Sequence, residues 1–394
     1  MMKILLLLLT LIISAQVFAQ ADRDLYIYND SQDTLVITPG KTKHMTEAPS
    51  KAITLAPGQN GVYKIHDDGF RDGAQIADFQ VSDTASGTKN TLSFEHKLSA
   101  SGWITTIDYD GTLSVNASCG SSGKNCLAPN SQKDASNHNA TVHFHSYFSK
   151  TPVFEENFSG NQVNEQNWNY RDLGKRNHCI NTKDAVSVNN GYLTITTYSK
   201  KLSNGKVANY CGMISTGTSK SGRGFLYKYG YWEASIRFHY TPHVQLAFWI
   251  QSPTMGVNPH DPEGSGLEMD VFEHTAGAKK NHYDQAFHWN GYGKYKKSWG
   301  SDHSNSSLDN SKFHLVAISW TPCGYTMYVD GHKTSRSPGS VPVSHAPEYI
   351  ILSTEVPFSY PSGGFGPLGK SHATFSVNYV RVYPYTGPSK CTLT

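Results

Sequence analysis

Apolar and polar residues alternate in short segments along most of the chain. In "DLYIYND", "GVYKIHDDG" and "YLTITTYS", apolar side chains recur with a period of two, which predicts β-strands with one buried face. Gly, Pro, Asn and Asp separate these segments and predict turns between them. The pattern therefore indicates an all-β protein.

The alternating segments fall into two blocks. Residues 20–150 predict a small β-rich domain that closes with the polar stretch "CGSSGKNCLAPNSQKDASNHNA", a loop or linker. Inside this block, Asp110 and Gly111 separate two strand-like runs and predict a tight hairpin turn. Residues 151–386 hold many further runs without a helical apolar period, which predicts a two-sheet sandwich. Residues 387–394 form a C-terminal tail.

The first residues, "MMKILLLLLTLIISAQVFAQ", predict a secretory signal peptide over residues 1–19. Lys3 supplies the positive end, an apolar run follows, and small residues precede Gln20. A membrane anchor is the alternative, but a spanning helix needs about 20 apolar residues and this run is shorter. We expect a secreted or periplasmic protein that leaves the membrane after cleavage and is a monomer.

Composition narrows the class of partner. The net charge is +3 with no basic run, so nucleic acid is not expected as a partner. Aromatic residues make up 12% of the chain and charged residues only 16%, which suits stacking on the apolar faces of sugar rings. A polysaccharide is therefore the expected partner.

Six cysteines in an exported protein predict disulfide bonds rather than a zinc site. Cys119 and Cys126 are close enough to close a small loop. Cys179–Cys211 and Cys323–Cys391 are the other pairs we expect, although six cysteines allow many pairings and the sequence does not choose among them. No C-x-x-C pair is present, so a structural zinc ion is not expected.

Three carboxylates stand in the apolar stretch "GSGLEMDVFEHTAG" with unequal gaps. Glu268 and Asp270 are two residues apart, so both point to one face of a strand. Glu273 would point to the other face of a regular strand. One β-bulge between Asp270 and Glu273 absorbs the extra residue and returns Glu273 to the face of the other two.

Acids on one face of a strand repel each other, and this repulsion does not stabilise a strand that has only a structural role. A retaining glycosidase does gain, because it needs two carboxyls about 5–5.5 Å apart, one as nucleophile and one as acid/base. Their repulsion raises one pKa and keeps a proton available for the leaving oxygen. The pattern therefore predicts glycoside hydrolysis by a carboxylate pair.

The stretch "LEMDVFEH" resembles the bulged E-x-D-x-x-E signature of glycoside hydrolase family 16, of the laminarinase and β-glucanase type. Other segments resemble the family in the expected order across residues 153–386, among them "FEENFSG", "YKYGYWEASIRF", "LAFWIQS", "AFHWNGYG" and "VNYVRVY". The resemblance implies a β-jelly-roll sandwich, with Glu268 as nucleophile, Glu273 as general acid/base and Asp270 as the assisting carboxylate. It implies no required cofactor.

The resemblance also implies a substrate class. We expect an endo-acting retaining enzyme on a β-linked polysaccharide, with β-1,3- or mixed β-1,3-1,4-glucan first; agarose, carrageenan and xyloglucan stay open because loops set substrate choice. A glucan-remodelling transglycosylase and a non-catalytic glucan-binding protein are the alternatives. Binding-only relatives typically lose the paired glutamates, and both are present here.

Several aromatic residues and one histidine are predicted to bind substrate. By position in the family's segments, Trp249 and Trp289 are expected in the cleft, with His288 beside the acid/base and Trp232 near the cleft or core. For each of these tryptophans the alternative is a place in the core. Trp168 and Trp299 are expected at outer subsites, and His274 is expected to be structural.

Two further sites are open at this stage. The family often carries a structural calcium ion, which Glu155 or Glu156 could bind here, although Asn378 replaces an Asp of many relatives. His143 and His145 alternate on one strand; we expect solvent-facing residues near a domain junction and no metal site, with metal binding by the two histidines as the alternative. The domain over residues 20–150 faintly resembles thaumatin-like domains and is expected to bind carbohydrate or to serve as a spacer.

Overall fold

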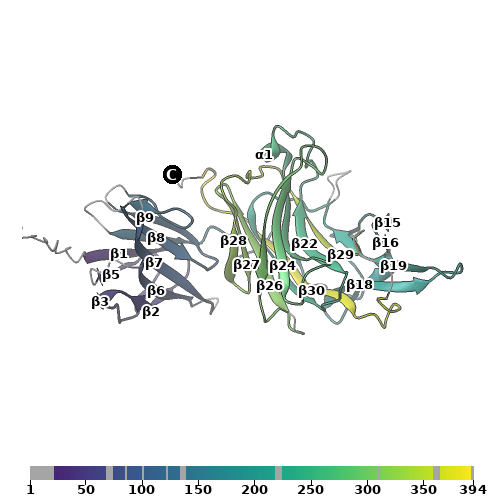
Figure 1. Cartoon of the computed structure of the whole chain (residues 1–394), viewed down its shortest axis with the longest axis horizontal. Coiled ribbons are helices and arrows are strands. Elements are labelled where there is room, and N and C mark those ends of the chain that lie inside the picture. Colours follow the sequence, from purple (N-terminus) through teal and green to yellow (C-terminus); the bar gives the residue numbers. More distant parts are fainter. Residues whose placement is uncertain are drawn as a thin grey trace, which may run out of the picture.

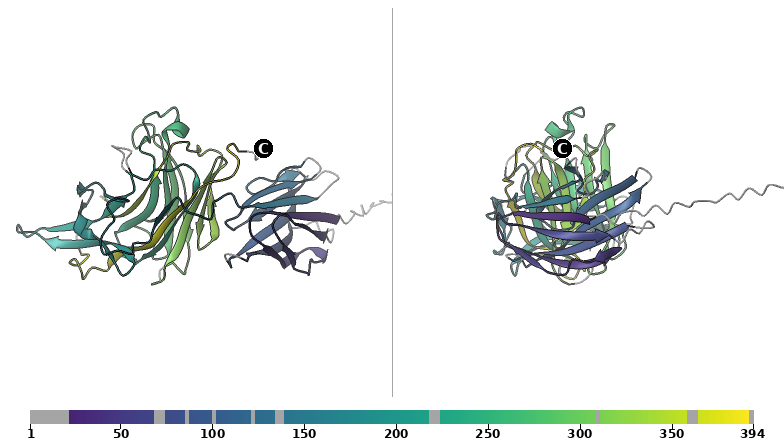
Figure 2. Two further views of the ribbon diagram at one scale, coloured as in Figure 1. Left: turned by 180° about the vertical axis from the view of Figure 1, so that it is seen from behind. Right: turned by 90° about the vertical axis from the view of Figure 1, so that its left-hand side faces the viewer.

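The structure is a computed structural model that describes residues 22–67, 74–84, 87–99, 102–120, 123–133, 139–217, 224–308, 311–357 and 364–391. The predicted signal peptide lies outside these ranges. Two β-rich units lie side by side, one built from the first third of the chain and one from the rest (Figure 1, Figure 2). Within the described ranges, no helix has both the length and the apolar character needed to cross a membrane.

The N-terminal unit consists of two sheets, each with six strands among the described residues. The first sheet has the order β10 (Lys124–Asn125), β9 (Ser114–Cys119), β12 (Ala140–His145), β1 (Asp22–Asp30), β5 (Asn60–Asp67), β3 (Met45–Glu47). The second has the order β11 (Gln132–Lys133), β8 (Gly102–Tyr109), β7 (Lys89–Ser99), β6 (Ala74–Asp83), β2 (Leu35–Lys43), β4 (Ile53–Leu55). The alternating apolar residues of both sheets form one core.

The C-terminal unit also has two sheets. In the described part of the chain, the back sheet runs β15 (Gly174–Arg176), β16 (Cys179–Asn181), β19 (Val207–Cys211), β18 (Tyr192–Lys201), β30 (Ala373–Tyr383), β21 (Gly230–Phe238), β26 (His314–Thr321), β27 (Gly324–Val329), β28 (His332–Arg336), with β13 (Phe154–Glu156) on β30 and β17 (Val186–Asn189) on β18. The front sheet runs β14 (Asn169–Tyr170), β20 (Met213–Ser215), β29 (Tyr349–Glu355), β22 (Gln245–Gln251), β23 (Glu268–His274), β24 (His282–Trp289), β25 (Lys297–Ser304). Short helical turns are η1 (Lys183–Ala185) and α1 (Pro262–Ser265).

The main core of this unit fills the space between its two sheets. β21 and β26 of the back sheet contribute Trp232 and Ile318, while β22 and β23 of the front sheet contribute Phe248 and Phe272. All four side chains are fully buried, and burial of each large apolar side chain stabilises the fold by about 1.5–3 kcal/mol. The predicted all-β jelly-roll sandwich, preceded by a β-rich N-terminal region, is confirmed.

The hairpin β27–β28 joins the C-terminal unit to the N-terminal one. The backbone N–H of Lys333 donates to the carbonyl of Asp110 at 2.5 Å, and its ammonium group pairs with the carboxylate of Asp108. Asn90 donates from Nδ2 to the carbonyl of Gly331 at 2.9 Å. These contacts, from one hairpin to the loop after β8 and to β7, fix how the two units meet.

Asp110 and Gly111 do not form a hairpin turn. They follow β8, which belongs to the second sheet of the N-terminal unit, and the next strand, β9, belongs to the first sheet. The predicted hairpin is therefore wrong: the chain crosses from one sheet to the other here, and a local sequence pattern does not show which sheet the next strand joins.

All three expected disulfide pairs are confirmed: Cys119–Cys126, Cys179–Cys211 and Cys323–Cys391. The second pair connects β16 to β19 at one end of the back sheet. The third ties the turn between β26 and β27 to the C-terminal segment. Three disulfides are consistent with an extracellular location.

Candidate active site

The three carboxylates of β23 lie on one face of the front sheet. In the ladder with β24, Glu268 stands opposite His288, Asp270 opposite Ala286, and Glu273 opposite Asp284. Their partners are evenly spaced two residues apart although the carboxylates themselves are not. The unequal sequence gap thus produces an equal spacing along the ladder.

A β-bulge between Asp270 and Glu273 makes this spacing possible, as the sequence predicted. The pairing shifts there against both neighbouring strands, β22 and β24. Val271 and Phe272 are both fully buried in the core, although successive residues of a regular strand point to opposite faces. The extra residue is therefore taken up on the core side, and Glu273 returns to the face of the other acids.

A buried glutamine holds the bulge. Gln285 of β24 is fully buried and donates from Nε2 to the carbonyl of Val271 at 3.1 Å. Its own Oε1 accepts from the hydroxyls of Thr334 at 2.9 Å and Ser335 at 2.8 Å on β28. A carbonyl that the bulge would leave without a partner is thereby bonded, and the bulge is tied to the back sheet.

Glu268 accepts hydrogen bonds from two neighbours. Nε2 of Gln251, opposite it on β22, donates to Oε2 at 2.8 Å, and the hydroxyl of Tyr292 donates to the same oxygen. Arg171 holds Gln251 in turn, donating to its Oε1 at 3.0 Å, and the hydroxyl of Tyr349 donates to that oxygen at 2.7 Å. Two donors aimed at one carboxylate oxygen fix the position of the Glu268 side chain.

Glu273 lies in a different electrostatic environment. Burial, followed by the charge of Asp270, raises the pKa of Glu273 to about 8, with a smaller contribution from Glu268 in the same direction. Nε2 of Gln245 on β22 donates to Oε1 of Glu273 and partly opposes the rise in this pKa. At neutral pH the Glu273 carboxyl therefore keeps its proton.

Asp270 lies between the two glutamates and beside His288. Nε2 of His288 is 3.2 Å from Oδ2 of Asp270. One nitrogen of His288 and one carboxylate oxygen each of Asp270 and Glu268 all lie within 4.8 Å of one another. Burial, then the charge of Glu268, raises the pKa of Asp270 well above its ordinary value. Burial lowers the pKa of His288, so the imidazole is neutral at neutral pH. The group can therefore hold and pass protons.

The structure separates the predicted substrate-binding residues. Trp249 pairs with Asp270 and shares its face, although only 7% of it is exposed; His288 also lies on this face, as expected. Trp289 follows His288 directly, points to the opposite face and packs in the core, so its prediction as a cleft residue is wrong. Trp232, expected near the cleft or core, lies in the core and not among the substrate-binding residues: it is fully buried between the sheets, where its indole N–H donates to the carbonyl of Tyr229.

Other sequence predictions divide in the same way. Trp168 is 1% exposed and packs in the core, so it is not an outer subsite; Trp299 packs against the core from its edge. His274 is buried, with Nδ1 2.7 Å from the carbonyl of His282, as expected of a structural histidine. The errors for Trp289 and Trp232 have one reason, because a motif position does not say which face of the sheet a side chain takes.

Sequence reasoning missed the residues that surround the glutamates: Gln245, Gln251, Arg171, Tyr292 and Tyr349. A signal existed for the two glutamines, because Gln245 and Gln251 have the same parity as Trp249 and so share its face of β22. No comparable signal existed for Arg171 and Tyr292, which reach the site from distant loops.

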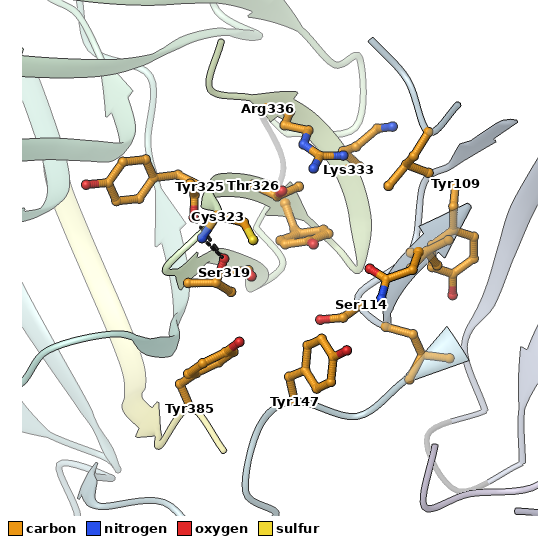
Figure 3. Close-up of a pocket in the computed structure, with 18 of the residues that line it drawn as sticks. Tyr109, Ser114, Tyr147, Ser319, Cys323, Tyr325, Thr326, Lys333, Arg336 and Tyr385 are labelled. Atoms are coloured by element: carbon orange, nitrogen blue, oxygen red, sulfur yellow. Dashed lines mark hydrogen bonds between the residues drawn. The ribbon is translucent and has the colours of Figure 1, made fainter. Parts of the chain in front are cut away.

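A separate cavity lies away from the carboxylates. One cavity of about 100 Å³ lies between the two units, where Tyr109 and Tyr147 of the N-terminal side approach Tyr385 and Lys333 of the C-terminal side (Figure 3). Its lining contains no carboxylate. It is a feature of the joint between the units and not of the candidate active site.

The two residues proposed for calcium both accept hydrogen bonds from the protein. Oε1 of Glu155 accepts from Nε of Arg381 at 2.9 Å. Glu156 accepts from the backbone N–H of Phe158 at 2.9 Å and from Nδ2 of Asn167 at 3.2 Å. The calcium site stays a prediction.

A sandwich with three carboxylates evenly spaced on one sheet face, two of them with a raised pKa, offers the groups that carboxylate-based glycoside hydrolysis needs. Residues 173–356 match the family model described as "Glycosyl hydrolases family 16". Over these residues the family resemblance stated from the sequence is confirmed.

Solved structures with a similar fold include three enzymes. The catalytic domain of an endo-1,3-beta-glucanase (laminarinase) from Thermotoga petrophila RKU-1 is 19% identical, with 60% of this chain and 98% of that chain covered and a TM-score of 0.47. Porphyranase B from Zobellia galactanivorans is 18% identical, with 59% and 92% covered and a TM-score of 0.47. An endo-beta-1,3-glucanase from Pyrococcus furiosus is 20% identical, with 62% and 100% covered and a TM-score of 0.46. No curated protein matches the sequence.

Proposed function

We propose that the protein is a secreted, endo-acting, retaining glycoside hydrolase that cleaves β-1,3- or mixed β-1,3-1,4-glucan. The observation that carries the proposal is the contrast between the two glutamates on the bulged strand. Glu273 has its pKa raised to about 8, whereas Glu268 accepts hydrogen bonds from Gln251 and Tyr292. One carboxyl suited to give a proton and one carboxylate suited to attack are the two groups that retaining hydrolysis needs.

The reaction would proceed in two displacements. The carboxyl of Glu273 gives its proton to the glycosidic oxygen while an oxygen of Glu268 attacks the anomeric carbon, which forms a glycosyl ester and releases the first product. The ionised Glu273 then takes a proton from water, whose oxygen attacks the same carbon and frees Glu268. Asp270, protonated and next to Glu268, would help to distribute charge between the two steps. No cofactor enters this sequence.

The substrate class rests on the family and on the sequence segments that resemble β-glucanases. Trp249 shares the face of the carboxylates and is the aromatic residue that we propose for substrate binding, with His288 as a polar neighbour. Export rests on the N-terminal apolar segment and agrees with three disulfides.

Product analysis on purified polysaccharides tests the proposal. The mature chain is incubated with laminarin, lichenan, curdlan, agarose, carrageenan and xyloglucan, and the products are separated by size. Short oligosaccharides from laminarin or lichenan are expected. Products longer than the donor would identify a transglycosylase, and cleavage of a galactan alone would keep the mechanism but refute the glucan substrate. Binding to insoluble glucan without any cleavage would identify a non-catalytic binding protein.

Paired substitutions test the two roles. Glu268→Gln and Glu273→Gln are each expected to lower kcat on polysaccharide by at least a thousandfold, the scale on which loss of a catalytic group acts. Glu273→Ala should retain activity on an aryl glycoside with a good leaving group, because that bond breaks without protonation, whereas Glu268→Ala should not. Glu233→Gln is the matched control, since Glu233 is a buried carboxyl on the back sheet with a raised pKa. Equal rates in wild type and either active-site variant would refute the assignment.

A further inference from the structure

A second histidine–carboxylate group lies in the N-terminal unit, far from β23 in the sequence. It consists of Asp30, His143 and His145. Nδ1 of His143 is 2.7 Å from Oδ2 of Asp30, and Nδ1 of His145 is 3.8 Å from the same oxygen. One ligand atom from each of the three residues lies within 4.8 Å of the other two. The group thus offers two imidazole nitrogens and one carboxylate oxygen to a common point.

The parallel pairing of β1 and β12 produces this convergence. Asp30 is the last residue of β1 and pairs with His145, the last residue of β12, while Tyr28 pairs with His143. The alternate residues of β12, such as Phe144, are fully buried in the core of the unit. Core packing therefore fixes both strands, while the histidines stand on the outer face, where folding does not require them.

Stacking fixes the two imidazole rings. The ring of Tyr28 stacks on His143 with centroids 4.4 Å apart and planes 8° apart, and the ring of Tyr147 stacks on His145 at 4.8 Å and 12°. Ring faces that contact each other are not free to receive a sugar ring, so this row of rings does not suit a carbohydrate platform. Their edges, which carry the nitrogens, remain available on the Asp30 side. Rings that are already ordered lose little entropy on binding a ligand.

We propose that Asp30, His143 and His145 form a binding site for a divalent transition-metal ion, with zinc as the first choice. Zinc binds imidazole nitrogen and carboxylate oxygen at about 2.0–2.2 Å, so ligand atoms around a tetrahedral ion lie about 3.3 Å apart. The observed separations of 2.7 and 3.8 Å lie on either side of that value. Two nitrogen ligands favour zinc, copper or nickel over calcium or magnesium. Water would complete the coordination.

A side chain of β9 can orient the second histidine. Asn116 lies on the outer side of the same ring, with Nδ2 3.3 Å from Nε2 of His145. When Nδ1 binds the ion, Nε2 carries the hydrogen, and the amide oxygen of Asn116 can accept it after rotation of the amide. The ion displaces the hydrogen that His143 and Asp30 share.

The position of the site indicates its effect. β1 is the first strand of the N-terminal unit and β12 the last, and the segment after β12 leads directly into the C-terminal unit. Lys150 in that segment already pairs with Asp33, just after β1, at 2.6 Å. An ion between Asp30 and the two histidines would connect the two ends of the unit where the linker begins. It would act as a staple on the N-terminal unit and would not take part in the reaction.

Metal binding to the full mature chain tests the proposal. The chain is stripped with a chelator and titrated with ZnCl2 by calorimetry, and separately with CoCl2 by visible absorption, which reports tetrahedral coordination. Wild type is expected to bind one zinc ion per chain at neutral pH, to melt at a higher temperature with zinc, and to lose affinity at least tenfold between pH 7.5 and pH 5.5. The double variant His143→Ala/His145→Ala is expected to lose affinity at least tenfold and the cobalt spectrum, with unchanged hydrolysis.

Two control variants locate the ion. His345→Ala removes an exposed histidine 3.6 Å from one carboxylate, Glu263, and should bind zinc like wild type. His288→Ala removes the histidine of the Glu268–Asp270 group and should also retain the zinc. Equal zinc affinity in wild type and in the folded double variant would overturn the proposal, as would loss of the ion in His288→Ala alone or no binding by wild type up to millimolar zinc. Far-UV circular dichroism establishes folding of each variant, and His143→Gln replaces the double variant if that fails to fold.

Discussion

Gln285→Leu removes the side chain that holds the bulge of β23. Leucine has a similar volume and suits a fully buried position, so the change tests the hydrogen bonds more than the packing. Three bonds are lost: one to the carbonyl of Val271, and one each from the hydroxyls of Thr334 and Ser335. The Thr334 hydroxyl keeps a second partner, the carbonyl of Met327 at 3.1 Å.

The cost follows from the groups left without a partner. The carbonyl of Val271 and the hydroxyl of Ser335 lose the partner that Gln285 provides, and each buried group left unbonded costs about 1–3 kcal/mol. We therefore expect the free energy of unfolding to fall by about 2–6 kcal/mol. The Val271 carbonyl is also free to turn, and a shift of about 1 Å in a catalytic group lowers rates about a hundredfold. We expect kcat to fall by at least about tenfold at a temperature where the variant is folded.

Urea unfolding and initial rates on a soluble glucan measure the two effects separately. Ser335→Ala is the matched control, because it removes one bond to Gln285 but leaves the bond to Val271 in place. It should cost about 1 kcal/mol of stability and leave kcat unchanged. If Gln285→Leu is less stable but has the kcat of wild type, the bulge does not depend on Gln285 and the positioning argument is refuted.

Three further outcomes follow from the same site. Tyr292→Phe removes a donor to Glu268 and should lower kcat about tenfold to a hundredfold with little change in KM, as steady-state kinetics will show; an unchanged kcat would contradict a role in holding the nucleophile. Because Glu273 is the acid, kcat/KM should fall as pH rises through about 8, and a fall already complete near pH 5 would exclude it. Glu348 is fully buried, accepts from the backbone N–H of Leu267 at 3.0 Å and has its pKa raised by burial to about 8. A carboxyl with a raised pKa stabilises the fold below its unfolded pKa, and this contribution is lost as pH rises through about 8. Wild type should therefore lose stability between pH 5 and pH 9. In chemical unfolding, Glu348→Gln should lose about 4 kcal/mol less than wild type over this range.

The bulge was predictable from the sequence because it leaves a local trace. Three acids in an apolar strand with gaps of two and three cannot share a face unless one residue is added. Strand alternation also contained a warning that the family resemblance obscured. His288 and Trp289 are adjacent, so a regular strand cannot direct both of them toward the acids, and the structure places Trp289 in the core.

Contacts between distant segments left no such trace. The parallel pairing of β1 with β12 joins Leu25 to Ala140, and Arg171 reaches Gln251 across 80 positions of sequence. These contacts depend on the order of strands in the sheets, which alternation within a strand does not encode. The turn after β8 shows the same limit: Asp110 has a typical turn sequence, yet it crosses between sheets and binds the backbone of Lys333.

The protein has two groups of acids and histidines: Glu268, Asp270 and His288 on β23 and β24, and Asp30, His143 and His145 on β1 and β12. The two groups differ mainly in how deeply they are buried. Asp270 is only 5% exposed, and burial raises the pKa of both Asp270 and Glu273, which suits acid catalysis by Glu273. The side chain of Asp30 is 40% exposed, so a metal ion can reach its carboxylate and keep some of its own water ligands. Greater exposure to water should therefore lower the raised pKa values of the buried group. A cavity opened above Asp270, for example by Trp249→Ala, should lower the pKa of Glu273 and shift the basic limb of kcat/KM to lower pH. If that limb stays near pH 8 in the variant, burial is not what holds the proton on Glu273.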